Sequence, residues 1–162
     1  MELIALLDKL RLNTLAERLE TVCETAAKRE LNYKEFLTEA LSVEFGDRQQ
    51  KGIEQRMTLA RLPYIKTIEQ FDFSFQPSID KKVIRELAGL GFVERSENVI
   101  LLGPPGVGKT HLSIALAVKA ITAGHRVLFM TLDQMLTKLK RAREENKLEK
   151  VLTTLVQLLA PI

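Results

Sequence analysis

A chain of 162 residues is long enough for one ordinary domain, or for a small helical unit and part of a larger one. Its 46% hydrophobic and 28% charged residues are typical of a globular protein and exclude a disordered one. The single cysteine, Cys23, excludes an internal disulfide framework, suits a reducing cytoplasm, and is expected to be buried or half-buried among helical residues. Charges at Asp8, Lys9 and Arg11 interrupt the first apolar segment, so we expect no secretory signal, no membrane partner and a cytoplasmic protein.

The net charge of +3 is unevenly distributed along the chain. Residues 1–98 carry 15 Lys and Arg against 17 Asp and Glu, a net charge of −2, whereas residues 99–162 carry 9 against 4, a net charge of +5. This basic excess is a mild indication that the second part of the chain meets a polyanion.

The first sixty residues predict helices. Leucines at helical spacing form the first apolar stripe: Leu3, Leu6, Leu7 and Leu10. Asn13 or Thr14 is expected to cap the next helix. Asn32 and Glu35 have the spacing of a capping box and predict the start of a third helix, with an apolar face made by Tyr33, Phe36, Leu37, Ala40 and Leu41.

A break or kink is expected at Gly46 and Asp47, followed by a separate charged helix from about residue 48 to residue 61, which Pro63 stops. Periodicity leaves two roles open for this helical region. It is either a scaffold or an adaptor that docks a partner protein.

Residues 63–78 differ from both flanks. Phe71, Phe73 and Phe75 alternate with polar residues, which predicts a short extended segment with one apolar face. Flexible linkers lack such aromatic residues, so this segment is expected to lie along the following domain. Its aromatic side chains then either contact a nucleotide or pack in the core.

The following part predicts an α/β fold. Asp80 is expected to cap a helix that carries Val83, Ile84, Leu87 and Leu90. A strand over residues 98–102, a largely buried helix over residues 109–122 and a second, parallel strand over residues 126–132 would form one βαβ unit of a doubly wound sheet.

Between the first strand and its helix stands GPPGVGKT, which fits G-x-x-x-x-G-K-[ST], the phosphate-binding P-loop. Glycines let the backbone turn tightly with its N–H groups pointing inward, and the helix adds the positive end of its dipole. Lys109 is expected to reach the β- and γ-phosphates of ATP, and the Thr110 hydroxyl to ligate Mg²⁺. The predicted cofactor-binding residues are Gly103, Pro104, Pro105, Gly106, Val107, Gly108, Lys109 and Thr110.

Residues 133–159 predict further helix, with N-capping as the expected role of Asp133. Basic residues crowd this stretch: Lys138, Lys140, Arg141, Arg143, Lys147 and Lys150. They indicate either a solvated helix face, paired with interleaved glutamates, or a contact with nucleic-acid phosphates.

Phosphoryl transfer also needs an acidic pair at the end of another buried strand. Nothing after Thr110 has the form of an apolar run followed by two acids, so no catalytic residue is assigned. Only two of about five expected strands are written, which predicts a truncated P-loop NTPase core.

Four stretches carry a family resemblance: NYKEFLTEAL, RLPYIKTIEQFDFSF, GLGFVERSENVILLGPPGVGKTHLSIALAVKA and GHRVLFMTLDQML. Across essentially all its residues the chain resembles the IstB-type ATP-binding helper proteins of bacterial insertion sequences, which are relatives of the DnaC-type helicase loaders. The resemblance implies an AAA+ (ASCE-class) ATPase that oligomerises on double-stranded DNA and assists a transposase, with ATP and Mg²⁺ as cofactors.

The same resemblance implies a helical adaptor domain over residues 1–62, a linker over 63–78 and a truncated AAA+ domain over 79–162. Family members continue into the Walker B strand that bears the Mg²⁺-binding acids and into arginine-finger segments, so the chain as written is expected to be hydrolysis-deficient. Two alternatives stay open: a helicase-loader-like adaptor for DNA replication, and an inert helical interaction module.

Overall fold

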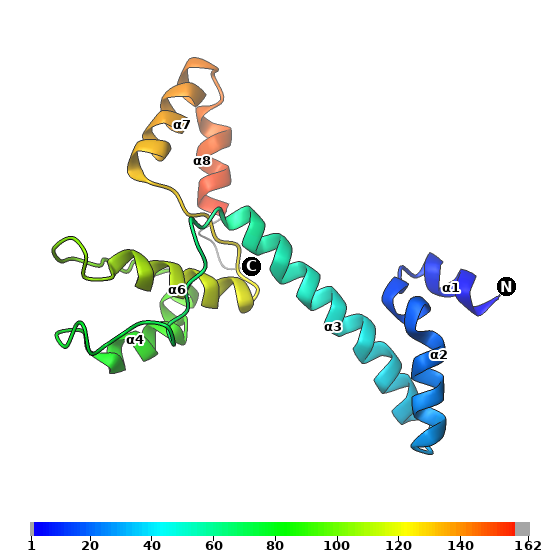
Figure 1. The fold of residues 1–162 in the computed structure, drawn as a ribbon. Coiled ribbons are helices and arrows are strands. Elements are labelled where there is room, and N and C mark those ends of the chain that lie inside the picture. The colour runs from blue at the N-terminus through cyan, green and yellow to red at the C-terminus, as the bar shows by residue number, and fades with distance from the viewer. Residues whose placement is uncertain (1, 158–162) are drawn as a thin grey trace. The chain divides into compact units, whose positions relative to one another are not determined.

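The computed structural model describes residues 2–157. It divides into two compact units, Met1–Gly52 and Ile53–Ile162. The helices, in chain order (Figure 1), are α1 Leu3–Lys9, α2 Asn13–Lys28, α3 Tyr33–Ala60, α4 Lys81–Ala88, α5 Gly91–Glu94, α6 Lys109–Thr122, α7 Leu132–Glu144 and α8 Leu148–Gln157.

The first unit confirms the predicted N-terminal helices. Its core consists of Leu7, Leu15, Val22 and Ala40, with Phe36 among the partly buried residues packed against it. Of the four leucines in the first stripe, only Leu7 is buried. The expectation for Cys23 is wrong, because its thiol lies on an exposed face of α2.

The start of α2 is held by side chains from α3. The predicted capping by Asn13 or Thr14 is wrong: the N-cap is Leu12, and it has no side-chain cap. Instead, the backbone N–H of Leu15 donates to the buried carboxylate of Glu44 over 3.1 Å. The Thr14 hydroxyl donates to Asp47 over 2.8 Å. Carboxylates near a helix N-terminus satisfy its open N–H groups and favour its dipole.

α3 begins with the predicted capping box. The Asn32 side chain accepts from the N–H of Glu35 over 3.0 Å, and the Glu35 carboxylate accepts from the N–H of Asn32 over 2.9 Å. The predicted break at Gly46 is wrong, since the helix continues through it to Ala60. Asp47 supports the continuing helix by pairing with Lys51 over 2.8 Å.

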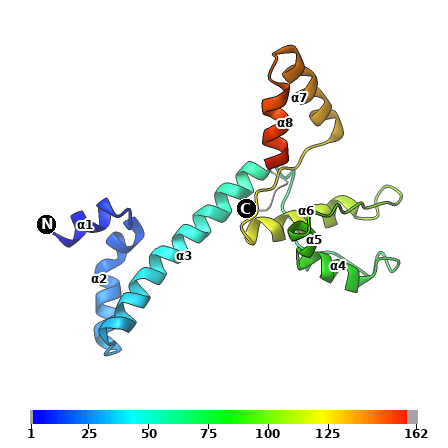
Figure 2. The same ribbon diagram turned by 180° about the vertical axis from the view of Figure 1, so that it is seen from behind.

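In the second unit, α4 and α6 contact one another and pack together with an aromatic segment. Phe71, Ile84 and Leu112 form the buried cluster, and α6 buries most of its apolar residues as predicted. Asp80 caps α4 by accepting from the N–H of Lys82 over 2.7 Å, also as predicted. The four-residue α5 follows α4 almost directly (Figure 2).

The predicted α/β fold class is wrong for this structure. Residues 2–157 contain no strand, and the two segments expected to form strands, 98–102 and 126–132, are irregular up to the start of α7. The backbone N–H of Phe129, in the second of these segments, donates to the carbonyl of Ala60 over 2.8 Å and not to the first segment.

The physical reason is a lack of partners. Strands are stable only when neighbouring strands satisfy their N–H and C=O groups, and a lone pair is marginal in water. Here a cavity of about 670 Å³ opens between the two segments, lined by Leu101 on one side and by Val127 and Leu128 on the other. Ile100 and Leu102 are 77% and 88% exposed, so burial does not hold the first segment either.

α7 and α8 form a helical hairpin (Figures 1 and 2). The expected N-capping by Asp133 is wrong: Thr131 is the N-cap and forms a capping box with Gln134, while Asp133 sits in the first turn. The predicted helix reached residue 159, and its last two residues lie outside the described part. Searched over that same part, no helix is long and apolar enough to cross a membrane.

Candidate nucleotide-binding site

Of the eight predicted cofactor-binding residues, 103–108 form the turn that leads into α6, and Lys109 and Thr110 are the first two residues of that helix. Two glycines there have left-handed backbones, with φ of +83° at Gly106 and +88° at Gly108. An L-residue with a side chain adopts this conformation only with strain, which explains glycine at both positions. Space around Gly106 is open, because a β-carbon built there would meet nothing within 4 Å. The loop therefore presents bare backbone where a ligand approaches closely.

α6 begins directly at the end of this loop, with Gly108 as its N-cap. Gly108 has no side chain to occupy the first N–H groups of the helix, and its own carbonyl already accepts from the N–H of Leu112 over 3.0 Å. The first N–H groups of a helix have no partner within the helix, and the dipole places positive potential beside them. Such an end is suited to an anion.

The Lys109 side chain folds back onto the start of the loop. Its Nζ donates to the backbone carbonyls of Gly103 over 2.8 Å and Pro104 over 2.6 Å. These bonds place the ammonium group beside the glycine-rich turn, where it adds a full positive charge. The following residue, Thr110, is exposed, so its hydroxyl is accessible next to that charge.

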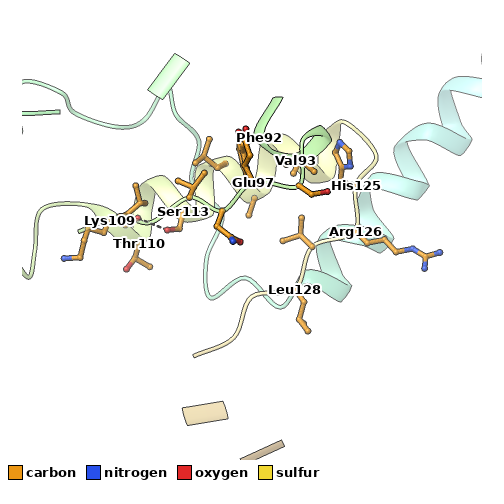
Figure 3. Close-up of a pocket in the computed structure, with 17 residues that line it drawn as sticks. Phe92, Val93, Glu97, Lys109, Thr110, Ser113, His125, Arg126 and Leu128 are labelled. Atoms are coloured by element: carbon orange, nitrogen blue, oxygen red, sulfur yellow. Dashed lines mark hydrogen bonds between the residues drawn. The ribbon is translucent and has the colours of Figure 1, made fainter. Parts of the chain in front are cut away.

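Two cavities flank the loop. The larger, of about 670 Å³, is lined by Lys109, Thr110 and Ser113 at the start of α6 and by His125 and Arg126 beyond its end. Figure 3 shows Lys109, Thr110 and Ser113 at one end of the helix, His125 beyond its other end, and Arg126 and Leu128 on the segment that follows. The smaller, of about 360 Å³, lies on the side of Gln76 and Ile79 and also reaches Gly103, Pro104 and Lys109.

These features fit a nucleoside triphosphate. The phosphates require converging N–H donors and a cation, which the loop glycines, the α6 N-terminus and Lys109 supply. Mg²⁺ prefers oxygen ligands, and the Thr110 hydroxyl is the exposed oxygen beside the loop. Within residues 2–157, no group of three or more His, Cys, Asp or Glu side chains gathers as a metal site.

The larger cavity also contains residues that the sequence did not single out. Glu97 lines it and pairs with Arg95 over 2.8 Å, and this guanidinium lowers the pKa of the Glu97 carboxyl. Ser113 lines it too, but its hydroxyl donates to the Lys109 carbonyl over 3.0 Å within the helix (Figure 3). Neither belongs to a motif, so no local pattern could have identified them.

The aromatic linker packs mainly in the core. Phe71 is buried, and Phe73 packs against the same cluster. Phe75, the third residue of the alternation, is 74% exposed. Of the two interpretations left open for this segment, core packing holds for Phe71 and Phe73.

Basic residues of α7, of α8 and of the turn between them form ion pairs or line a hollow. Glu145 accepts from Arg141 over 2.8 Å and from Lys147 over 2.9 Å, and these two cations lower its pKa to about 2, with Lys147 as the larger influence. Beside this pairing, a hollow of about 520 Å³ is lined by Arg143, Lys147 and Lys150. The turn between the helices thus gathers three of the six predicted cations around one depression.

Comparison with known proteins places these features in a family. The family profile described as IstB-like ATP binding protein matches residues 5–161. A Pseudomonas aeruginosa protein named for ATP binding in insertion sequence IS21 is 62% identical over 95% of this chain. Similarly named proteins are 43% identical over 92% of the chain, in insertion sequence IS5376 of Geobacillus stearothermophilus, and 36% identical over 88%, in insertion sequence IS232 of Bacillus thuringiensis subsp. berliner.

The chain spans 58%, 59% and 57% of the lengths of these three relatives, respectively. Its match to the family profile nevertheless includes both units and the whole glycine-rich loop. The resemblance inferred from the four sequence stretches is thereby confirmed, and the chain belongs to the family of IstB-like ATP binding proteins.

Proposed function

We propose that this chain is an ATP-binding helper of an insertion-sequence transposition system. The observation that carries the proposal is the loop of residues 103–110, where two left-handed glycines, the N-terminus of α6 and Lys109 converge on one open turn. The names of its relatives support the setting, since each joins ATP binding to an insertion sequence.

In this proposal the loop N–H groups and the first N–H groups of α6 bind the phosphate oxygens. Lys109 exchanges its two carbonyl partners, those of Gly103 and Pro104, for the β- and γ-phosphates, which carry more negative charge. The Thr110 hydroxyl holds Mg²⁺, which would neutralise part of the triphosphate charge. The proposed cofactors are therefore ATP and Mg²⁺. The proposal covers the binding of ATP and not its hydrolysis.

We further propose that the partners are a transposase and double-stranded DNA, and that copies of the protein assemble with one another on the DNA. The basic residues of α7 and α8 support the DNA contact, because Arg143, Lys147 and Lys150 line one hollow and residues 99–162 have a net charge of +5. Cations grouped in this way bind phosphates without reading the base sequence.

Titration of the purified chain with a fluorescent ATP analogue tests the proposal. Replacing Lys109 by Ala removes a charge-assisted contact worth about 1.5–3 kcal/mol, so the dissociation constant should rise roughly 10- to 100-fold. Lys82→Ala is the matched control, because it removes the same charge from an exposed position on α4. Equal and negligible binding by the wild-type chain and Lys109→Ala would sink the proposal.

A further inference from the structure

The linker reaches the phosphate loop through a single buried ring. Phe71, which is only 9% exposed, packs against Ile84 of α4 and Leu112 of α6. Phe73 and His111 approach its ring edge-on, with centroids 4.9 Å and 5.2 Å away. Such edge-to-face pairs fix ring orientation as well as burying apolar area. The Phe71 ring is therefore held from several sides.

This ring lies directly on Gly108, the N-cap of α6. A β-carbon built on Gly108 would lie 2.5 Å from Cε2 of Phe71 and 3.0 Å from its Cζ. No side chain fits at that separation, so the ring occupies the space that any residue other than glycine would need. Gly108 is thus constrained twice, by its φ of +88° and by its contact with Phe71.

Polar contacts fix the rest of the linker turn to α6. A backbone carbonyl only accepts hydrogen bonds, so Nε2 of His111 must carry the proton that it donates to the carbonyl of Thr67, over 3.0 Å. Further along the helix, Lys119 lies 3.7 Å from Glu69. The turn from Thr67 to Phe71 therefore runs beside α6 from His111 to Lys119 and cannot shift without breaking these contacts.

Phe71 does not line either of the two cavities beside the loop. Its ring supports the turn from the core side, next to Leu112, whereas Lys109 and Thr110 face the larger cavity. The Phe71 ring is therefore not placed to contact a ligand directly. It is placed against the backbone that would make the contact.

We propose that Phe71 is a positioning residue for phosphate binding: by seating on Gly108 it holds the loop in the conformation that directs its N–H groups, and those of the α6 N-terminus, at the ligand. This inference rests on the proposed ATP binding. A site held in place before the ligand arrives loses less conformational freedom on binding, and loosening its support lowers affinity even though every ligand-contacting group is retained.

Calorimetric titration of the full chain tests the inference, with MgATP and with inorganic tripolyphosphate as probes. Phe71→Leu removes the ring, and Phe73→Leu is the matched control, because Phe73 packs on the same cluster while the three atoms nearest a β-carbon built on Gly108 all belong to Phe71. Phe71→Leu should weaken both probes by about tenfold or more. Phe73→Leu should bind both probes as tightly as the wild type does. Without ligand, its midpoint of thermal unfolding should be comparable to that of the wild type.

A purely structural role for Phe71 would lower the unfolding midpoint and leave the affinity of the folded fraction unchanged, which would overturn the inference. If Phe71→Leu does not fold, Phe71→Met fills more of the volume without a flat ring, and the same comparison applies. Failure of the proposed function is distinguishable: the wild-type chain itself would then bind MgATP no better than Lys109→Ala does.

Discussion

Glu145 controls how much positive charge the turn between α7 and α8 presents to a polyanion. Because Lys147 and Arg141 hold its pKa at about 2, down from 4.5, this carboxylate is ionised at any pH at which DNA would be bound. Its stabilising interactions are fully present above pH 4.5 and are lost as the pH falls through about 2. Near neutral pH, the single negative charge of Glu145 therefore offsets one of the two positive charges of Arg141 and Lys147.

Replacing Glu145 by Gln should strengthen the proposed DNA contact, because Arg141 and Lys147 become available to phosphates. Each new phosphate contact adds about 0.9 to the slope of log affinity against log salt concentration, so the slope should steepen by roughly one to two. Fluorescence anisotropy with a duplex at several salt concentrations measures it.

Glu149→Gln is the control for this measurement, because it removes the same charge from the lining of the hollow without breaking the ion pairs of Arg141 and Lys147 with Glu145. Equal slopes for the two variants would show that the released cations do not meet DNA.

At the scale of single residues, the sequence predicted the site residues that are neighbours in the chain. The eight loop residues are neighbours in the chain, so one motif predicted them together. Phe71 stands 37 positions before Gly108, and although the alternating aromatics signalled a packed segment, nothing local specified which glycine the ring would contact. Glu97 lines the larger cavity only because the folded chain places it there, and no local sequence pattern indicates that position.

Among the helices, α2 shows how one element depends on another for its start. Glu44 of α3 accepts from the N–H of Leu15 over 3.1 Å and from Arg48 over 3.0 Å, with 5% of the residue exposed. Glu44→Ala leaves the Leu15 N–H unsatisfied in a buried position. The free energy of unfolding of the first unit should then fall by about 1–3 kcal/mol. Urea unfolding followed by circular dichroism measures this change.

Glu39→Ala provides the comparison, because Glu39 also forms an ion pair within the first unit, with Arg29 over 2.8 Å, but on the exposed surface. Exposed pairs contribute about 0–1 kcal/mol. If both substitutions cost the same, Glu44 is not the support of α2 that its position indicates.

Helix starts were predictable where the capping group is local. The Asn32 box and the Asp80 cap lie within three residues of the N–H groups they satisfy, and both were expected. The support for α2 comes from residue 44, 29 positions beyond Leu15, which no capping pattern covers. Gly46 weakens a helix by only about 1 kcal/mol relative to alanine, and the surrounding contacts of α3 outweigh it.

For the molecule as a whole, α6 was predictable because its ends and its apolar content are written in consecutive residues. The sheet was not. The segments 98–102 and 126–132 have the composition of buried strands, but strand formation depends on partners elsewhere in the chain. Pairing is a property of the assembled sheet, so β-rich composition alone overpredicted it here.

Amide hydrogen exchange on the whole chain distinguishes the two descriptions. Because no strand ladder protects them, the amides of residues 98–102 and 126–130 should exchange near their intrinsic rates, apart from Phe129, whose N–H donates to Ala60 over 2.8 Å. The amides of α6, including those of the buried Ile114 and Ile121, should be the most protected in the second unit. Alternating or continuous protection along both segments would instead require a paired sheet and contradict the helical structure described for residues 2–157.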